Sequence, residues 1–314
     1  MRNHVSSKLL ATVAASAASV TSVGVVAAHA ADAQTIDPAV VDSRIKIAFE
    51  GAVYQSNVDK LGDTTDKLGS NNGFGDLYGS VALTKAISPD VDWRLAGSFH
   101  AGQDNDTSFD IPITGSDPGN VNLSFGNSYN FQTLDFDIGK HVQAQSADIR
   151  FFGGLRLLHS KEEISLHEGI TRDNPADKSG SADKLGSSEF YGIGPRLGAE
   201  VYYPLGETWG LTGAVSGSAM WGRRTNKISL SATQHDPGAI PPDPIDQTIN
   251  ASESQHSSEV VTNVDLSGGV TFKPWDNTTF TAGYRVEQWH NLLQLSDKST
   301  QTFNGPFLRL EVKM

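Results

Sequence analysis

Residues 44–53 read Arg-Ile-Lys-Ile-Ala-Phe-Glu-Gly-Ala-Val, and this stretch decides the fold class. Its large apolar residues and Gly51 stand on odd positions, whereas its charged residues and two alanines stand on even positions. A period of two residues is typical of a β-strand with one apolar and one polar face. The stretch therefore predicts a strand, because a helix would repeat its apolar residues every three or four positions.

The same alternation recurs along the chain, and no segment shows a convincing helical period. Nine further segments carry it, at 76–84, 92–100, 133–138, 148–157, 191–203, 209–221, 260–273, 280–287 and 308–314. Across their central parts the apolar face contains no Asp, Glu, Lys or Arg. We therefore expect an all-β fold of ten strands.

The connections between these strands alternate in length. Short connections fall near 88–90, 140–147, 204–208 and 274–277. Mostly long ones, rich in Asp, Asn, Ser and Gly, fall near 55–74, 102–127, 160–187, 223–257 and 291–300. Ten strands with both termini on the short-turn side is the hairpin topology of an outer-membrane barrel. Twelve strands remain an alternative if the segment Asn226–Thr233 pairs as an extra hairpin arm.

Alternation alone also fits a water-soluble β-sandwich, in which the apolar face forms the interior. Three features favour a membrane barrel, in which the apolar face meets lipid and the charged face lines the lumen. Glycine is frequent within the strands, and the chain ends inside a strand with Leu310, Val312 and Met314 on the apolar face. Aromatic residues also gather near strand ends, as two interfacial girdles require. These are Trp93, Tyr203, Trp209, Trp275 and Phe280 by the short turns, and Phe99, Tyr191 and Trp221 by the long connections. We predict a transmembrane antiparallel up-and-down barrel over residues 43–314, with short periplasmic turns and long extracellular loops.

The N-terminus predicts export. Residues 1–30 have the form of a secretory signal peptide, with basic Arg2 and Lys8, an apolar stretch from Leu9 to Ala28, and a small-x-small cleavage pattern at residues 28–30. We expect residues 31–42 to form a short periplasmic segment before the barrel. The chain has no cysteine, which excludes a disulfide scaffold, a thiolate zinc site and a cysteine nucleophile. An exported chain without cysteine fits a bacterial envelope, and we expect the outer membrane.

Charge and composition argue against several classes of function. With 24 basic against 36 acidic residues, the formal charge is −12, which argues against a nucleic-acid partner. Gly192, Gly194, Gly73 and Gly75 lie within or beside strands with no helix after them, so phosphate-binding loops are excluded. Asp104, Asp106 and Asp110 lack the spacing of a calcium loop, and no pair of histidines has ligand spacing. We expect no cofactor, no metal site and no enzymatic activity.

The polar face of the strands predicts a charged lumen. Ten residues on it are candidates to line a pore: Arg94, Arg150, Arg156, Arg196, Glu200, Asp265, Arg285, Glu287, Arg309 and Glu311. Such pairs satisfy charge in a confined space and can select permeants. The segment 209–221 presents only small inward groups, and we expect any water path to follow it past Ser216. Barrels of about this size can instead be filled by side chains, so a non-conducting barrel whose loops serve adhesion or envelope structure is the alternative.

Three segments resemble one family. They are DIRFFGGLR at 148–156, FYGIGPRLGAE at 190–200 and NGPFLRLE at 304–311. The chain resembles the Legionella-type major outer membrane protein family of pore-forming barrels, in strand order over most of the mature chain. The resemblance implies a porin-like passive diffusion channel for small solutes or ions, with outer-membrane lipid and lipopolysaccharide as surroundings. A surface protease of the omptin type is a further alternative, if His100, His159 and His290 meet acidic residues in one cleft.

Overall fold

The computed structural model describes residues 44–58, 75–102, 105–115, 118–172, 179–236, 245–295 and 299–314. All of them belong to one unit, Val41–Met314. The predicted signal peptide at 1–30 and the predicted segment at 31–42 lie outside the described residues. Their assignment therefore stays a prediction.

The described residues form one antiparallel sheet of eleven strands. The strands are β1 (Ile45–Ser56), β2 (Asp76–Ser88), β3 (Val91–Ala101), β4 (Asn105–Ile113), β5 (Gly119–Ala144), β6 (Ala147–Arg172), β7 (Ser179–Pro204), β8 (Trp209–Asp236), β9 (Ile245–Trp275), β10 (Thr278–His290) and β11 (Thr300–Lys313). Within these ranges no helix is long and apolar enough to span a membrane.

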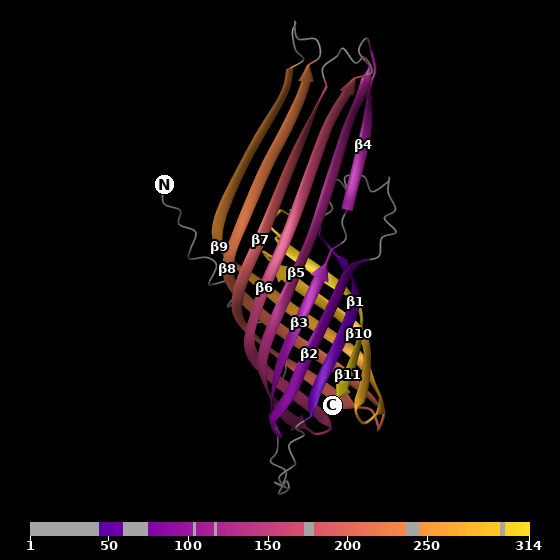
Figure 1. The fold of residues 1–314 in the computed structure, drawn as a ribbon. Helices are drawn as coiled ribbons and strands as arrows, with labels where there is room; N and C mark the ends of the chain where they lie inside the picture. The colour runs from indigo at the N-terminus through magenta and orange to yellow at the C-terminus, as the bar shows by residue number, and fades with distance from the viewer. Residues whose placement is uncertain are drawn as a thin grey trace. The chain divides into compact units, whose positions relative to one another are not determined.

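Ten of the strands close into a ring (Figure 1). Each strand pairs with its neighbour in the chain, β1 pairs with β11, and β3 skips β4 to pair with β5. Among the described residues β4 pairs with β5 alone, so it lies outside the ring. The predicted ten-stranded barrel is confirmed, and the twelve-stranded alternative is wrong. Residues 226–233 continue β8, because they pair with both β7 and β9.

One end of the barrel carries short turns, as the sequence predicted. The turns at 89–90, 145–146, 205–208 and 276–277 join consecutive strands. At the same end the first and last strands close on each other, since the Ile45 N–H donates to the Met314 carbonyl at 3.1 Å and the Met314 N–H donates back at 2.9 Å. This is the short-turn end.

The outer surface of the ring is apolar. For example, Phe49, Phe136, Leu197 and Leu308 are each at least 45% exposed. Exposed apolar area spread around a whole ring would not remain dispersed in water, and it matches a lipid-facing belt. The predicted girdle residues are exposed at its two margins, Trp209 and Trp275 near the short turns and Tyr191 and Trp221 on the opposite side.

At the other end of the barrel, the strands are longer than the sequence predicted. Segments 102–127, 160–187 and 223–257 were predicted as loops but are mostly strand. As a result β5 to β9 have 26 to 31 residues, whereas the other strands of the ring have 11 to 14. Serine and asparagine alternate there with apolar residues, which keeps the two-residue period at low hydrophobicity. The sheet therefore continues beyond the ring on one side (Figure 1). We call this part the extension, and it comprises β4 and residues 119–128, 163–172, 179–187, 227–236 and 245–259.

Candidate functional site

The lumen of the ring contains a cavity of about 420 Å³. All ten residues that the sequence nominated for a pore line it. They come from β3, β6, β7, β9, β10 and β11, and they reach the lumen because the two-residue period turns every second side chain inward. Lys46, Lys273 and Lys313 also line the cavity, towards the short-turn end.

Near the short turns, the Asp92 carboxylate is the shared partner of an arginine and a histidine. The Arg150 guanidinium donates to both of its carboxylate oxygens, with the shortest N···O distance 2.7 Å. The His141 ring lies between Asp92 and Asp148, with a nitrogen 3.0 Å from an oxygen of each. An arginine and a histidine on neighbouring strands thus satisfy one buried carboxylate.

Arginines and aspartates cross-link the middle of the lumen. Asp137 is fully buried and accepts hydrogen bonds from both Arg94 and Arg196. The Phe152 ring lies among three guanidinium groups, 5.0 Å from that of Arg94, 5.2 Å from that of Arg150 and 4.6 Å from that of Arg196. An inward phenylalanine surrounded by cations is stabilised by its negative ring face.

A second charged group lies across the lumen. The Glu50 carboxylate pairs with Arg285 and with Arg309, whose Nε donates to it at 2.6 Å. Arg285 also donates to the Tyr78 hydroxyl at 2.8 Å, and its Nε lies 3.4 Å from Asp265. Since β1, β2, β9, β10 and β11 supply these groups, the ion pairs tie separate strands across the interior.

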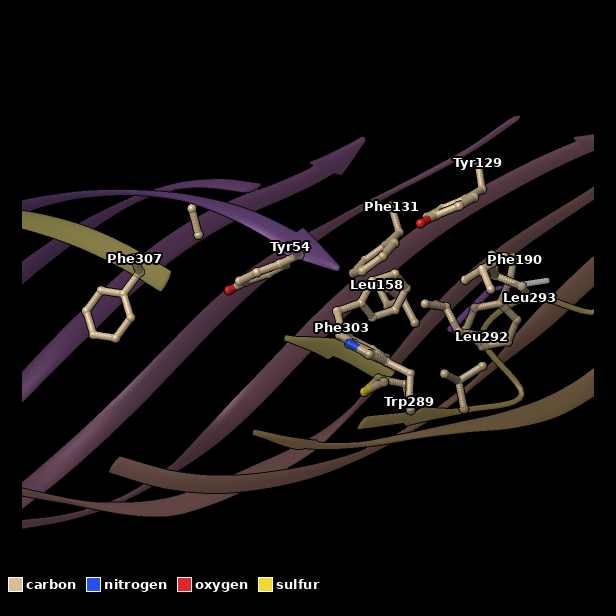
Figure 2. Packing of buried hydrophobic residues seen from close by; sticks show 14 residues of the cluster. Tyr54, Tyr129, Phe131, Leu158, Phe190, Trp289, Leu292, Leu293, Phe303 and Phe307 are labelled. Carbon is tan, nitrogen blue, oxygen red and sulfur yellow. The ribbon is translucent and has the colours of Figure 1, made fainter. Parts of the chain in front are cut away.

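Above this level the lumen becomes apolar. Glu287 marks the boundary, since it accepts a hydrogen bond from the Trp289 indole at 3.1 Å and lies 3.3 Å from the His100 ring. Beyond it lies a layer of inward side chains that we call the plug, and Figure 2 shows its aromatic core. The plug comprises Tyr54, Tyr129, Phe131, Leu158, Phe190, Met220, Val261, Trp289, Leu292, Leu293 and Phe303, all at most 6% exposed. A solute crossing the barrel would have to displace part of this layer.

Two plug residues are carried by a connection rather than a strand. Leu292 and Leu293 follow β10, and they turn into the lumen (Figure 2). The Arg224 guanidinium holds this turn by donating to the carbonyls of Asn291 and Leu292. The Glu162 carboxylate holds its far end by accepting the backbone N–H groups of Gln294 and Leu295 at 2.9 and 2.8 Å. We call residues 291–295 the tethered segment.

Sequence reasoning missed the plug. Its strand residues share the inward parity of the charged residues, and apolar side chains such as Tyr54 and Phe190 at inward positions were the available signal. The tethered segment gave no periodic signal, because it lies in a connection. On β8, Thr212, Ala214 and Ser216 line the cavity as expected of a water path, but Met220 continues the same face into the plug.

The three histidines of the surface-protease alternative do not meet. His100 is buried in the lumen beside Glu287, whereas His159 stacks on Tyr191 with ring centroids 4.2 Å apart on the outer surface. His290 is exposed and lies 3.2 Å from the Thr300 hydroxyl. Because the barrel wall separates these groups, they form no shared cleft. In the described parts of the chain no three His, Asp or Glu side chains are grouped to hold a metal ion.

Comparison with known proteins identifies a family. Residues 84–314 match the family described as Legionella pneumophila major outer membrane protein precursor. No curated protein sequence matches the chain. Among solved structures, the outer membrane protease OmpT from Escherichia coli has a TM-score of 0.41 at 8% identity, covering 87% of this chain and 97% of that one. A major outer membrane protein from Thermus thermophilus has a TM-score of 0.33 at 13% identity, covering 86% of this chain and 98% of that one.

Proposed function

Because the chain belongs to the Legionella pneumophila major outer membrane protein family, we propose that its barrel is a porin-like channel of the bacterial outer membrane, through which small solutes or ions diffuse passively. The outer belt faces outer-membrane lipid and lipopolysaccharide. In barrels of this membrane the short turns face the periplasm, so the charged cavity opens on that side and the plug closes the external side.

The charged cavity carries this proposal. A barrel with a purely structural role gains nothing from an open space of about 420 Å³ lined by ionised groups, since filling it with apolar side chains would stabilise the fold. A diffusion channel requires such a space, because charged walls replace part of the hydration of a permeant.

The plug makes this the closed state of the channel. Its strand-borne residues are fixed by the barrel, whereas Leu292 and Leu293 are held by the tethered segment. Movement of that short segment would open a path without breaking any strand pair. Apolar constrictions of this type close pores by excluding water.

Planar-bilayer recording of the refolded chain from residue 31 tests the proposal. We expect infrequent conductance steps from the native chain and frequent ones from the Leu292→Ala, Leu293→Ala double variant. Heat-modifiable migration on gels verifies that both chains form barrels. Silence from a folded double variant would contradict the channel.

The second candidate function is a non-conducting barrel that acts in adhesion or envelope structure. The extension favours it, because a sheet that reaches beyond the barrel is available to other molecules (Figure 1). A folded but silent double variant that retains surface binding would support this candidate.

A further inference from the structure

A groove of about 590 Å³ lies in the outer surface of the barrel, at the aromatic margin beside the extension. It crosses four adjacent strands, β5 to β8, because Leu134 pairs with Leu157, Leu157 with Ile193, and Ile193 with Trp221. These four side chains are 44% to 55% exposed and belong to the lipid-facing belt. The groove is therefore separate from the charged cavity, which lies on the other side of the wall.

Polar side chains border the groove on the side away from the short turns. His159 and Tyr191 line it there, and their rings stack with centroids 4.2 Å apart. The Glu189 carboxylate accepts the Tyr191 hydroxyl at 2.8 Å and lies 3.1 Å from the His159 ring, so it fixes both rings. The surface thus changes from apolar to polar within two residues along each strand. A lipid molecule makes the same change between its acyl chains and its headgroup.

Basic side chains on the outer face gather at this groove. Arg223 pairs with Tyr191 in the strand register, and Lys161 pairs with Glu189. By contrast, the described outward positions at the same end of β1, β2, β3, β10 and β11 carry no lysine or arginine. This concentration of positive charge beside an apolar groove favours a ligand that has both an anionic group and an acyl chain.

Arg223 is the group best placed to bind the anion. The neighbouring carboxylates are engaged, since Glu163 lies 2.8 Å from Lys161, and Glu189 contacts His159 and Tyr191. Arg223 is exposed, and its guanidinium contacts no carboxylate in the part of the chain that the structure describes. A planar guanidinium matches the oxygens of a phosphate group with two parallel hydrogen bonds.

The place of the groove in the membrane defines the lipid. With the short turns facing the periplasm, the groove lies in the external leaflet, where lipopolysaccharide supplies both acyl chains and phosphate groups. We propose that an acyl chain of lipopolysaccharide lies in the groove against Leu157, Ile193 and Trp221, and that Arg223 binds one of its phosphate groups. This site takes only the orientation of the barrel from the proposed function, and it does not require the lumen to conduct.

Tryptophan fluorescence tests the proposal, because Trp221 lines the groove. The refolded chain from residue 31 is placed in nanodiscs of phosphatidylcholine with brominated acyl chains, which quench the tryptophans that they touch. The emission of Trp221 is the difference between the native chain and Trp221→Phe. Trp209→Phe gives the matched control, because Trp209 lies at the opposite margin and is 51% exposed, against 55% for Trp221. Lipopolysaccharide without bromine is then added as the probe.

We expect lipopolysaccharide at about 5 mol% to restore more than half of the Trp221 emission, because a bound lipid keeps the bulk lipid out of the groove. The Trp209 emission should recover only about one twentieth, which is the result of random mixing at that mole fraction. Equal recovery of the two tryptophans would overturn the proposal. Equal recovery of Trp221 with phosphatidylglycerol at the same phosphate content would overturn the assignment to lipopolysaccharide, because any anionic lipid would then serve.

Arg223→Ala tests the phosphate contact. It should raise the half-restoring fraction of lipopolysaccharide about tenfold, because it removes hydrogen bonds between two charged groups. Lys227→Ala is the matched control, since Lys227 is an exposed cation on the same face of β8, four residues further from the groove, and it should leave that fraction unchanged. Heat-modifiable migration verifies that each variant folds. An unchanged fraction in folded Arg223→Ala, or an equal rise in the control, would overturn the assignment.

Discussion

Glu162→Gln should open the channel by loosening the tethered segment. The Glu162 carboxylate is 1% exposed and accepts two backbone N–H groups, from Gln294 at 2.9 Å and Leu295 at 2.8 Å. Glutamine keeps an acceptor oxygen in the same place but removes the charge. The substitution therefore weakens the closed state and leaves the volume of the side chain almost unchanged.

The size of the effect follows from the two hydrogen bonds. A hydrogen bond to a charged group contributes about 1.5–3 kcal/mol and a neutral one about 0.5–1.5 kcal/mol, so each loses about 1 kcal/mol on substitution. Two of them together lower the stability of the closed state by about 2 kcal/mol. Since about 1.4 kcal/mol corresponds to a factor of ten, the ratio of open to closed channels should rise about 30-fold.

Long single-channel recordings in planar bilayers measure this ratio directly. Glu163→Gln is the matched control, because Glu163 is the next residue and pairs only at the surface with Lys161, at 2.8 Å. We expect the control to match the native chain. An unchanged open probability in folded Glu162→Gln, or an equal rise in the control, would refute the role assigned to the tethered segment.

Three further substitutions test the lumen and the wall. Arg156→Ala should destabilise the barrel by about 3 kcal/mol in urea unfolding from lipid vesicles, because it leaves the Asp135 carboxylate buried without its two-pronged partner. Arg309→Glu should shift the reversal potential in a salt gradient towards cation selectivity, since it reverses a charge on the cavity wall. Gly154→Ala should abolish heat-modifiable folding, because its Cβ would overlap the Phe136 carbonyl oxygen, whereas Gly153→Ala, with 3.9 Å to its nearest neighbour, should fold.

The ring was predictable from the sequence because lipid imposes a strict alternation. Outward positions between the girdles must be apolar, so apolar residues such as Leu197 and Leu308 recur at every second position. Each strand of the ring can therefore be recognised in the sequence. The same parity assigned the inward charges, and for that reason Arg94, Arg196 and Glu200 were found on the cavity wall.

The extension and the plug were not predicted, and the physical reason is different. In the lipid, outward positions must be apolar, but outside it they can be polar. The segment around Ile228, Ser229 and Leu230 therefore has the polar composition of a loop. The plug depends on contacts between distant strands and on two leucines in a connection. The strand-borne part shows in the sequence only as apolar side chains, such as Tyr54 and Phe190, at inward positions, and the two leucines leave no periodic signal.

Along the wall from β5 to β9, the polarity of the inner and outer faces changes more than once. These changes show where the plug lies relative to the membrane. Near the short turns the wall is polar inside and apolar outside, which suits a wet lumen in lipid. At the level of Tyr191 and Trp221 the outside reaches its aromatic margin, and just there the inside becomes apolar through Phe190 and Met220. Beyond that margin the outside is polar, and the inside passes through the buried polar residues Ser188, Arg224 and Glu162 before it becomes apolar again at Ile228 and Leu230. Because the inner surface changes at the same level as the outer girdle, the plug lies at the external boundary of the membrane. In the channel that we propose, a gate in this position would keep the charged cavity continuous with the periplasm and close it towards the outside.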